Sequence, residues 1–488
     1  MKNIKLKKYL RGDVLVSVIV FSVIAITITI GLVNWGAALL RNIQGTKDRE
    51  QALQIAEAGI DYYRWHLAHS PSDFKDGTNQ PGPYVHNFTD KDGTVIGNYA
   101  LTITPPTTGS TIVTIVSKGT IASNTNISRS IKVVMAIPSL AQYATAANDD
   151  MRFGPGTEVF GPIHSNKGIR FDGLAHNVIS SSLSTYNDPD HSGNSEFGVH
   201  THIVSGSVVD TFRALEAPPS TVQSRPDVFQ SGRLFPVPAI DFVGLTTNFS
   251  QLKTLAQSSG KYFAFSSSQG YHIVLKNNNT FDIYKVTALK SAPSQCTSDG
   301  ALQWGTWSIK DETLLANYPI PANGVIFVED HVWVDGLING SRVTIAAAKL
   351  PDPGSGLQPN ITINNDLVYT KKDGTDSIGL IAQGNINVGL FSEDVLEIDA
   401  SLVAQNGRVG RFYYSSSCKS GQNNYYIRSS LSLYGMIATN LRYGFAYTDG
   451  TGYQTRNISY DSHLLYGPPP SFPLTSSYYQ VLSWQEVR

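Results

Sequence analysis

Two histidines in the stretch FGVHTHI have the most metal-like spacing in the sequence. His200 and His202 are separated by one residue, so both would point to the same face of a β-strand. Imidazole nitrogens that converge in this way are common ligands of zinc. Just upstream, DPDHSGNSE places Asp188, Asp190 and Ser192 at the alternating positions that open a calcium-binding loop.

The calcium pattern is incomplete. Such a loop closes on a bidentate glutamate, and Val199 occupies that position. Polar residues with this spacing more often lie in solvated turns than around an ion. We therefore expect no bound metal and no cofactor, and we keep these five residues as weak metal candidates.

Acidic side chains form the second set that could do chemistry. Parallel β-helices include polysaccharide-cleaving enzymes whose carboxylates lie in an exposed groove. Acids on solvated turns are far more common, and phosphate-binding glycine loops and the H-E-x-x-H and G-x-S-x-G motifs are absent. We therefore expect no enzymatic activity. The acids that such an activity would use are Glu329, Asp330, Asp335, Glu393, Asp394, Glu397 and Asp399.

Cys296 and Cys418 are the only cysteines in the chain, and each lies in a polar, loop-like stretch. Two cysteines of an exported protein often pair. Closing so long a loop would stabilise the fold by roughly 4–5 kcal/mol if the stabilisation is entropic. We expect a disulfide here, and two separate buried thiols are the alternative.

The N-terminal residues decide on which side of a membrane these groups lie. Residues 14–33 carry no charge, and about 20 such residues span a bilayer as a helix. A secretory signal has a shorter apolar run of about 7–15 residues. Trp35 follows where an interfacial aromatic would lie, and basic residues stay cytoplasmic. We predict a single-pass anchor with its N-terminus inside, oriented by Lys2, Lys5, Lys7, Lys8 and Arg11.

Residues 41–67 continue the helix in amphipathic form. Apolar and small residues recur there at steps of three and four, and Ser70-Pro71 is a plausible stop. The uncharged run and this amphipathic continuation together would form one helix roughly 80 Å long. A juxtamembrane helix that only docks the outer domain is the alternative. The stripe consists of Ala52, Ala56, Gly59, Ile60, Tyr63 and Leu67.

This N-terminal region resembles type IV pilins and pseudopilins, in particular minor pilins of the PilX type. The residues that carry the resemblance are the basic leader ending in Gly12, the uncharged run and the AEAG of the amphipathic half. The resemblance implies that a prepilin peptidase removes residues 1–12 and that the new N-terminus at Asp13 is methylated. It also implies that the helix of residues 13–68 stays in the inner membrane until the pilus assembly machinery packs it against other pilin subunits.

The sequence departs from the family at two positions. Members usually have Phe or Met first in the mature chain and Glu fifth, whereas this chain has Asp13 and Ser17. The Glu pairs with the terminal amine of a neighbour, and a buried unpaired charge is costly. Ser17 cannot form that pair, and Asp13 could only neutralise its own amine. Subunits without the Glu resemble those at filament tips.

Residues 69–140 resemble the small antiparallel head of a minor pilin. Three stretches alternate with period two and are separated by Pro-Pro, Thr-Gly and Ser-Asn-Thr-Asn. This pattern predicts a meander. The alternating residues are Tyr99, Leu101 and Ile103, then Ile112, Thr114 and Val116, then Ile131, Val133 and Met135.

Residues 141–488 are predicted to form a large β-rich display domain. Only 15% of all residues are charged and the net charge is −1, which gives no electrostatic case for nucleic acid. A loose repeat predicts coils of a parallel β-solenoid, or β-helix, with an insertion at about 173–320. A β-sandwich with Asn-Gly hairpins is the alternative. The repeated words are PIHSNKGIRF, LINGSRVTI, LIAQGNINV, LVAQNGRVG and MIATNLRYG.

The sequence therefore predicts a mostly β, α+β protein that acts as a minor or tip pilin-like subunit. Its partners would be other pilin subunits, the prepilin peptidase and the assembly machinery, and its β-domain would serve adhesion or priming through a surface ligand. It would lie in the inner membrane and then outside the cell in a pilus. A pseudopilin of a type II-like secretion system and a membrane-anchored β-helix enzyme acting on polysaccharide are the alternatives.

Overall fold

The computed structural model describes residues 12–107, 110–242, 248–294, 296, 305–354, 356–474 and 478–487, and the side chains of residues 12, 13 and 248 are not among them. The predicted leader thus lies outside the described residues, apart from the backbone of Gly12. The chain divides into two compact units. The first contains Met1–Pro105, Val113–Met135 and Val481–Arg488, and the second contains Pro106–Ile112 and Ala136–Gln480.

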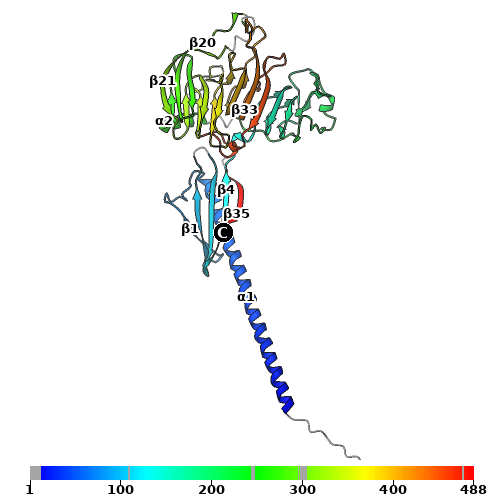
Figure 1. Ribbon diagram of the computed structural model, residues 1–488, viewed down its shortest axis with the longest axis vertical. Helices are drawn as coiled ribbons and strands as arrows, with labels where there is room; N and C mark the ends of the chain where they lie inside the picture. Colours follow the sequence, from blue (N-terminus) through cyan, green and yellow to red (C-terminus); the bar gives the residue numbers. More distant parts are fainter. Residues whose placement is uncertain are drawn as a thin grey trace, which may run out of the picture. The chain divides into compact units, whose positions relative to one another are not determined.

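The first unit begins with one unbroken helix, α1, which spans Gly12–His69 and has 58 residues. At 1.5 Å per residue it is about 87 Å long. Figure 1 shows that its N-terminal half projects away from the small sheet, whereas its C-terminal half lies against that sheet. The prediction of a single long N-terminal helix is confirmed.

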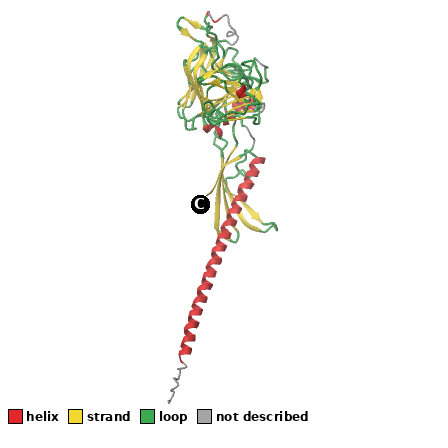
Figure 2. Ribbon diagram, turned by 90° about the vertical axis from the view of Figure 1, so that its right-hand side faces the viewer, coloured by secondary structure: helices red, strands yellow, loops and turns green. Residues whose placement is uncertain are grey.

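A small antiparallel sheet packs against the amphipathic half of α1 (Figure 2). The predicted stripe is confirmed, because Ala52, Ala56, Gly59, Ile60 and Tyr63 are all buried. The sheet has five strands in the order β1 (Tyr84–Thr89), β2 (Val95–Thr104), β3 (Val113–Ile121), β4 (Asn124–Ala136) and β35 (Gln480–Val487).

The structure corrects two expectations for this sheet. On β3 every odd-numbered residue from Val113 to Ile121 is buried, so the alternation runs through the odd positions and not through 112, 114 and 116. Both sets are largely apolar, which makes the burial pattern of this strand ambiguous in sequence. In addition, β35, which we placed in the large domain, is the neighbour of β4.

The second unit is built mainly from parallel strands, which form a sheet of 21 strands in the described part of the chain. In one ladder Thr344 pairs with Gly379, which pairs with Ser401, which pairs with Met436. In spatial order this ladder contains β18 (Lys261–Phe263), β22 (Val325–Val328), β24 (Arg342–Ala347), β27 (Ser377–Ala382), β29 (Val395–Ala404), β33 (Ile427–Thr439), β5 (Thr145–Ala147), β8 (Ile163–Ser165), β11 (Ile179–Ser181) and β17 (Arg233–Leu234).

Further parallel ladders run beside the first, and the long strands β29 and β33 belong to two of them. The second ladder contains β19 (Gly270–Lys276), β23 (Val332–Ile338), β26 (Leu367–Tyr369), β29, β33, β34 (Gly452–Tyr460), β7 (Thr157–Phe160) and β10 (Leu174–Ala175). A third continues from β23 through β25 (Ile361–Thr362), β28 (Ile386–Val388) and β30 (Val409–Arg411). A separate sheet joins β6 (Met151–Phe153), β9 (Ile169–Phe171) and β14 (Val199–His200).

Antiparallel pairing in the second unit is local. The strands β20 (Thr280–Leu289) and β21 (Ile309–Pro319) add a meander to β19. Among the described strands of the large sheet, the other pairs are parallel, which does not fit the alternative of a sandwich built from hairpins. Small two-stranded ribbons pair β12 (Thr185–Tyr186) with β13 (Glu196–Phe197), β15 (Ile203–Val204) with β16 (Ser207–Val208), and β31 (Lys419–Ser420) with β32 (Asn423–Asn424).

The core of the second unit lies between the ladders. Ile345, Leu380 and Leu402 belong to one large apolar cluster, and their neighbours Ile381 and Val403 belong to a second cluster on the other face of the strands. Helix α2 (Asn248–Ser259) contributes residues to that second cluster and so covers the outer face of the first ladder. Burial on both faces explains why these strands read as continuous apolar runs.

The repeated words fall at corners between ladders. In PIHSNKGIRF, LIAQGNINV and LVAQNGRVG the polar turn follows a strand of the first ladder, and an amide chain links Asn166 to Asn148 and Asn148 to Asn440. The expected insertion at 173–320 needs correction, because β10, β11 and β17–β19 within it belong to the large sheet. The chain enters the first ladder at β5, beside β33, so sequence order and spatial order differ.

Candidate functional sites

The apolar half of α1 is not buried by any other described part of the chain. The large apolar side chains from Val14 to Leu40 are each 46–72% exposed. The helix is long and apolar enough to cross a membrane. Exposure of this extent is unfavourable in water, so the segment requires lipid or the apolar surface of other subunits. This half of the helix therefore fits a membrane anchor. Ser17 lies within this half.

The amphipathic half of α1 approaches the sheet at glycine positions. A Cβ atom added to Gly119 on β3 would lie 2.2 Å from the carbonyl oxygen of Ala52 and 2.5 Å from the amide nitrogen of Ala56. A Cβ atom added to Gly59 on the helix would lie 2.3 Å from the Oγ of Ser117. Only glycine permits so close an approach of two backbones. Helix and sheet therefore form one tightly packed body.

The loop after α1 is tied back to the helix by polar contacts. The hydroxyl of Tyr62 donates to Asp76 Oδ1 at 3.0 Å, and His86 Nε2 lies 2.7 Å from Asp76 Oδ2. Burial and the hydrogen bond to Asp76 raise the pKa of Tyr62 to about 12. His66 Nε2 lies 3.1 Å from Asp73 Oδ2. These contacts fix the end of the helix against the first strand of the small sheet.

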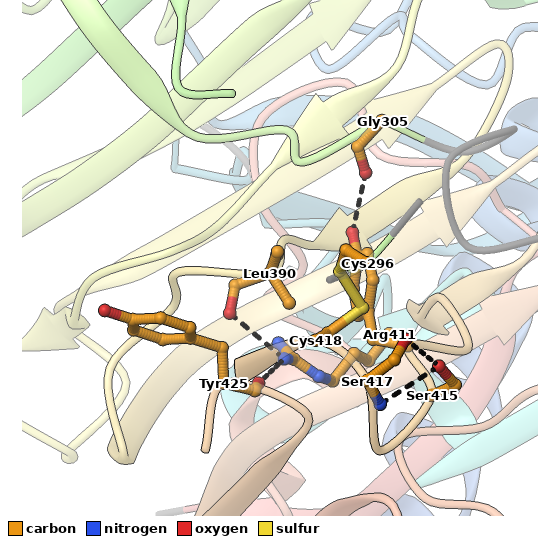
Figure 3. The surroundings of a disulfide bond; sticks show 9 residues. Cys296, Gly305, Leu390, Arg411, Ser415, Ser417, Cys418 and Tyr425 are labelled. Carbon is orange, nitrogen blue, oxygen red and sulfur yellow. Dashed lines mark hydrogen bonds between the residues drawn. A yellow bond between two sulfur atoms is a disulfide. The ribbon is translucent and has the colours of Figure 1, made fainter. Parts of the chain in front are cut away.

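Cys296 and Cys418 are joined by a disulfide in the structure (Figure 3). Both side chains are buried, in an apolar cluster with Leu390, Phe412 and Tyr414. The two cysteines are 122 residues apart in sequence. The bond links the loop before β21 to the loop after β30.

A buried arginine lies beside this disulfide (Figure 3). Arg411 Nη2 donates to the carbonyl oxygen of Leu390 at 3.1 Å and to that of Tyr425 at 2.7 Å. Its Nη1 donates to the carbonyl oxygen of Gly389 and to Ser392 Oγ. Burial lowers the pKa of Arg411 to about 10. The guanidinium thus satisfies carbonyl groups that the loops leave unpaired, which is a structural role.

The acids that we weighed as an enzymatic set bind several separate partners. Glu329 binds Lys253 and Tyr262, Asp330 binds Ser266, and Asp335 binds His272 and Asn365. Asp394 accepts from the backbone and side chain of Ser429, and the pKa of Glu393 is raised by burial and by Asp366. Glu397 and Asp399 share Lys372, whose Nζ lies 2.9 Å from each carboxylate.

Two grooves on the second unit contain some of these acids. A groove of about 250 Å³ is lined by His272, Glu312, Asp335 and Trp333, among others. Burial lowers the pKa of His272, but hydrogen bonds to Asp335 and Glu312 outweigh it and raise the pKa to about 9. A second groove of about 320 Å³ holds Glu397 and Asp399, and burial raises the pKa of Asp399 to about 6 although Lys372 lowers it.

The structure does not form the calcium loop that the sequence suggests at residues 188–196. The carboxylate of Asp190 binds Arg442 and Arg152, and Ser192 is exposed. Asp188 instead turns inward, as do His200 and His202.

Two residues that the sequence reasoning missed, His191 and Glu196, lie with these three. Their ligand atoms and those of Asp188 and His202 all fall within 4.8 Å of one another. The missed signal is the spacing itself, Asp-x-x-His, then Glu five residues later, then His-x-His.

No protein-family model and no curated protein matches the chain. Among solved structures, the competence-associated pilin ComZ from Thermus thermophilus is similar over 90% of this chain and 98% of its own, with 14% identity and a TM-score of 0.31. At this score neither a fold nor a function is transferred from it.

Proposed function

We propose that this chain is a minor, tip-associated pilin-like subunit that assembles through α1 and displays the second unit outside the cell. The observation that supports this most directly is the division of α1 into two halves. One half is apolar and exposed, and the other is buried on a small antiparallel sheet of the same chain. A plain anchor has no need of a rigid helix continuous with its outer domain, whereas a subunit that packs helix to helix requires one.

The display unit is proposed to be a parallel β-solenoid. Support comes from the successive parallel ladders, from the apolar interior that both main ladders share, and from the amide chain at one corner. The unit follows β4 in sequence and precedes β35, so it is inserted between two neighbouring strands of the small sheet. Such a unit offers long, regular faces for adhesion to a ligand or for priming of assembly.

We propose that the unit is not an enzyme, since the acids that could serve catalysis bind structural partners. One observation favours the polysaccharide-active alternative, namely the groove that holds Glu397 and Asp399, an acid whose pKa is raised to about 6. Against it, Lys372 binds both carboxylates. A pseudopilin would use the same helix. It would differ from a pilin only because a type II-like secretion system, and not a pilus, incorporates the subunit.

Tip placement rests on Ser17. In the pilins that this chain resembles, a Glu at this place pairs with the terminal amine of a neighbour, and an unpaired buried charge costs several kcal/mol. With Ser17 the wild-type chain is expected at filament ends or at isolated points, as seen by immunogold labelling. Ser17→Glu should increase incorporation along the shaft, whereas Ser17→Gln, of the same shape without the charge, should not.

Dense and regular labelling along the shaft by the wild-type chain would contradict tip placement. Equal labelling of the Glu and Gln variants would show that the charge at this position does not govern incorporation. In both cases the carboxylate of Asp13 would be the next group to test by substitution with Asn.

A further inference from the structure

Residues 188–202 gather three histidines and two carboxylates that the proposed function does not use. They are Asp188, His191, Glu196, His200 and His202, and their side chains are all buried or nearly so, with His191 the most exposed at 4%. We propose that this cluster binds one divalent transition-metal ion of the zinc type. The ion would be structural, and it would fix a segment that otherwise has little regular structure.

The ligand atoms converge at the separations that a metal imposes. Glu196 Oε2 lies 3.1 Å from the Nε2 of His191 and 3.2 Å from the Nε2 of His200, and Glu196 Oε1 lies 3.1 Å from the Nε2 of His202. Asp188 Oδ2 lies 3.5 Å from the Nε2 of both His191 and His200. Ligands about 2.0–2.1 Å from a tetrahedral zinc ion are roughly 3.3 Å apart. These carboxylate-to-imidazole distances bracket that value, and the ligand atoms of Asp188, His191, Glu196 and His202 all lie within 4.8 Å of one another.

The second ring nitrogen of each histidine is held by a backbone carbonyl. The Nδ1 of His191 bonds the oxygen of Ser192 at 3.2 Å, that of His200 bonds Phe197 at 3.3 Å, and that of His202 bonds Val209 at 2.8 Å. Because a carbonyl oxygen only accepts, each Nδ1 carries the hydrogen. In the neutral ring the Nε2 lone pair then points into the cluster. This orientation by an outer carbonyl is typical of metal-bound histidine.

Without a cation the centre of the cluster is poorly satisfied. Asp188 Oδ2 and His200 Nε2 are both buried and make no hydrogen bond of acceptable geometry. If the three imidazoles are neutral, their Nε2 lone pairs face the carboxylate oxygens, which also carry lone pairs, and the two repel each other. Three imidazolium rings would instead lie side by side, with centroids only 4.9 Å apart for His191 and His202 and 5.1 Å for His200 and His202. One divalent ion relieves both conflicts.

The nearest fixed positive charge is already engaged. Arg170 Nη1 lies 3.6 Å from Asp188 Oδ2, but the same guanidinium binds Asp172 and Asp210. The single charge of Arg170 is therefore shared among Asp172, Asp188 and Asp210. Imidazole and carboxylate ligands together favour zinc and its neighbours over calcium, which takes oxygen ligands alone.

The site would join short, irregular pieces of chain to a sheet. Asp188 and His191 lie in irregular turns, Glu196 is on the two-residue strand β13, and His200 is on β14, which pairs with β9. A bound ion would join these turns to the sheet of β6, β9 and β14. We therefore expect metal removal to loosen residues 185–213 and to leave the parallel ladders intact.

The test uses the full chain in detergent, carrying an affinity tag without histidine. The protein is stripped with chelator, loaded with Zn²⁺, freed of excess metal by gel filtration, and analysed by plasma mass spectrometry. We expect one ion per chain, and with Co²⁺ we expect visible absorption from nitrogen and oxygen ligation. Proteolysis should cut residues 185–213 faster in the stripped protein than in the loaded one.

A paired variant, Glu196→Gln with His202→Ala, should lose the ion. The matched control is His176→Ala, because His176 also binds a carboxylate, Glu158, through Nε2 at 2.5 Å but lies outside the cluster. If the paired variant does not fold, the proposal is tested with the wild-type chain alone. We then expect it to retain one ion and to unfold at a higher temperature when loaded than when stripped. No retained metal in the wild type, or full metal content in a folded paired variant, would overturn the proposal.

Discussion

Replacing Gly119 by valine is expected to separate the amphipathic half of α1 from the small sheet. The new Cβ would lie 2.2 Å from the carbonyl oxygen of Ala52 and 2.5 Å from the amide nitrogen of Ala56, and neither backbone atom can move without shifting the helix. Overpacking of this kind costs about 3 kcal/mol. Amide hydrogens of residues 50–67 should then exchange roughly 100-fold faster, since every 1.4 kcal/mol is a factor of ten.

The neighbouring residue provides the matched control for this substitution. Lys118 is on the same strand, and its side chain is exposed on the opposite face. Lys118→Val adds the same side chain, so it should leave the exchange of α1 unchanged. Unchanged protection of residues 50–67 in the Gly119 variant would show that the helix does not depend on this contact for its position.

Removal of the disulfide is expected to have the largest effect on the second unit. Cys296 and Cys418 close a loop with a separation of 122 residues, and the chain-entropy model assigns about 5 kcal/mol to such a bond. The variant with both cysteines replaced by alanine should therefore unfold at much lower denaturant concentration. The transition can be followed by the fluorescence of Trp307 and Trp333, which both lie between the two cysteines in the sequence.

Reduction of the wild-type chain should reproduce the effect of the double variant. Ser417→Ala, one residue from Cys418, serves as the control for changes in the loop itself. Alkylation provides the independent check, because both thiols should be protected in the native protein and freed by reductant. Complete labelling of both cysteines without reductant would contradict the bond.

The long helix could be predicted from sequence because its signals are local. The uncharged run and the stripe through Ala52, Ala56, Ile60 and Tyr63 each depend only on spacing along one helix. The burial of β3 could not be read with the same certainty. Both Ile112 and Val116 on one face and Val113 and Ile115 on the other are apolar, so alternation does not identify the inner face.

The arrangement of the second unit depends on pairing between distant residues. The repeated words mark corners correctly, but nothing in them indicates that β5 lies beside β33 or that β35 joins the small sheet. The sequence predicts the cluster at residues 188–202 only in part, because its formation also depends on contacts that the fold creates. A calcium-loop template selected Asp190 and Ser192, whereas the fold turns His191 and Glu196 inward with Asp188.

If α1 is the assembly helix of a processed pilin-like subunit, as we propose, the mass of the mature N-terminus will reveal the processing. Cleavage after Gly12 leaves a chain that starts at Asp13, and N-methylation adds the mass of one methyl group. We predict this N-terminus for the wild-type protein and a retained leader for Gly12→Leu. A wild-type chain that begins at Met1, or one that begins beyond Trp35, would show that α1 is not the helix of a processed pilin-like subunit.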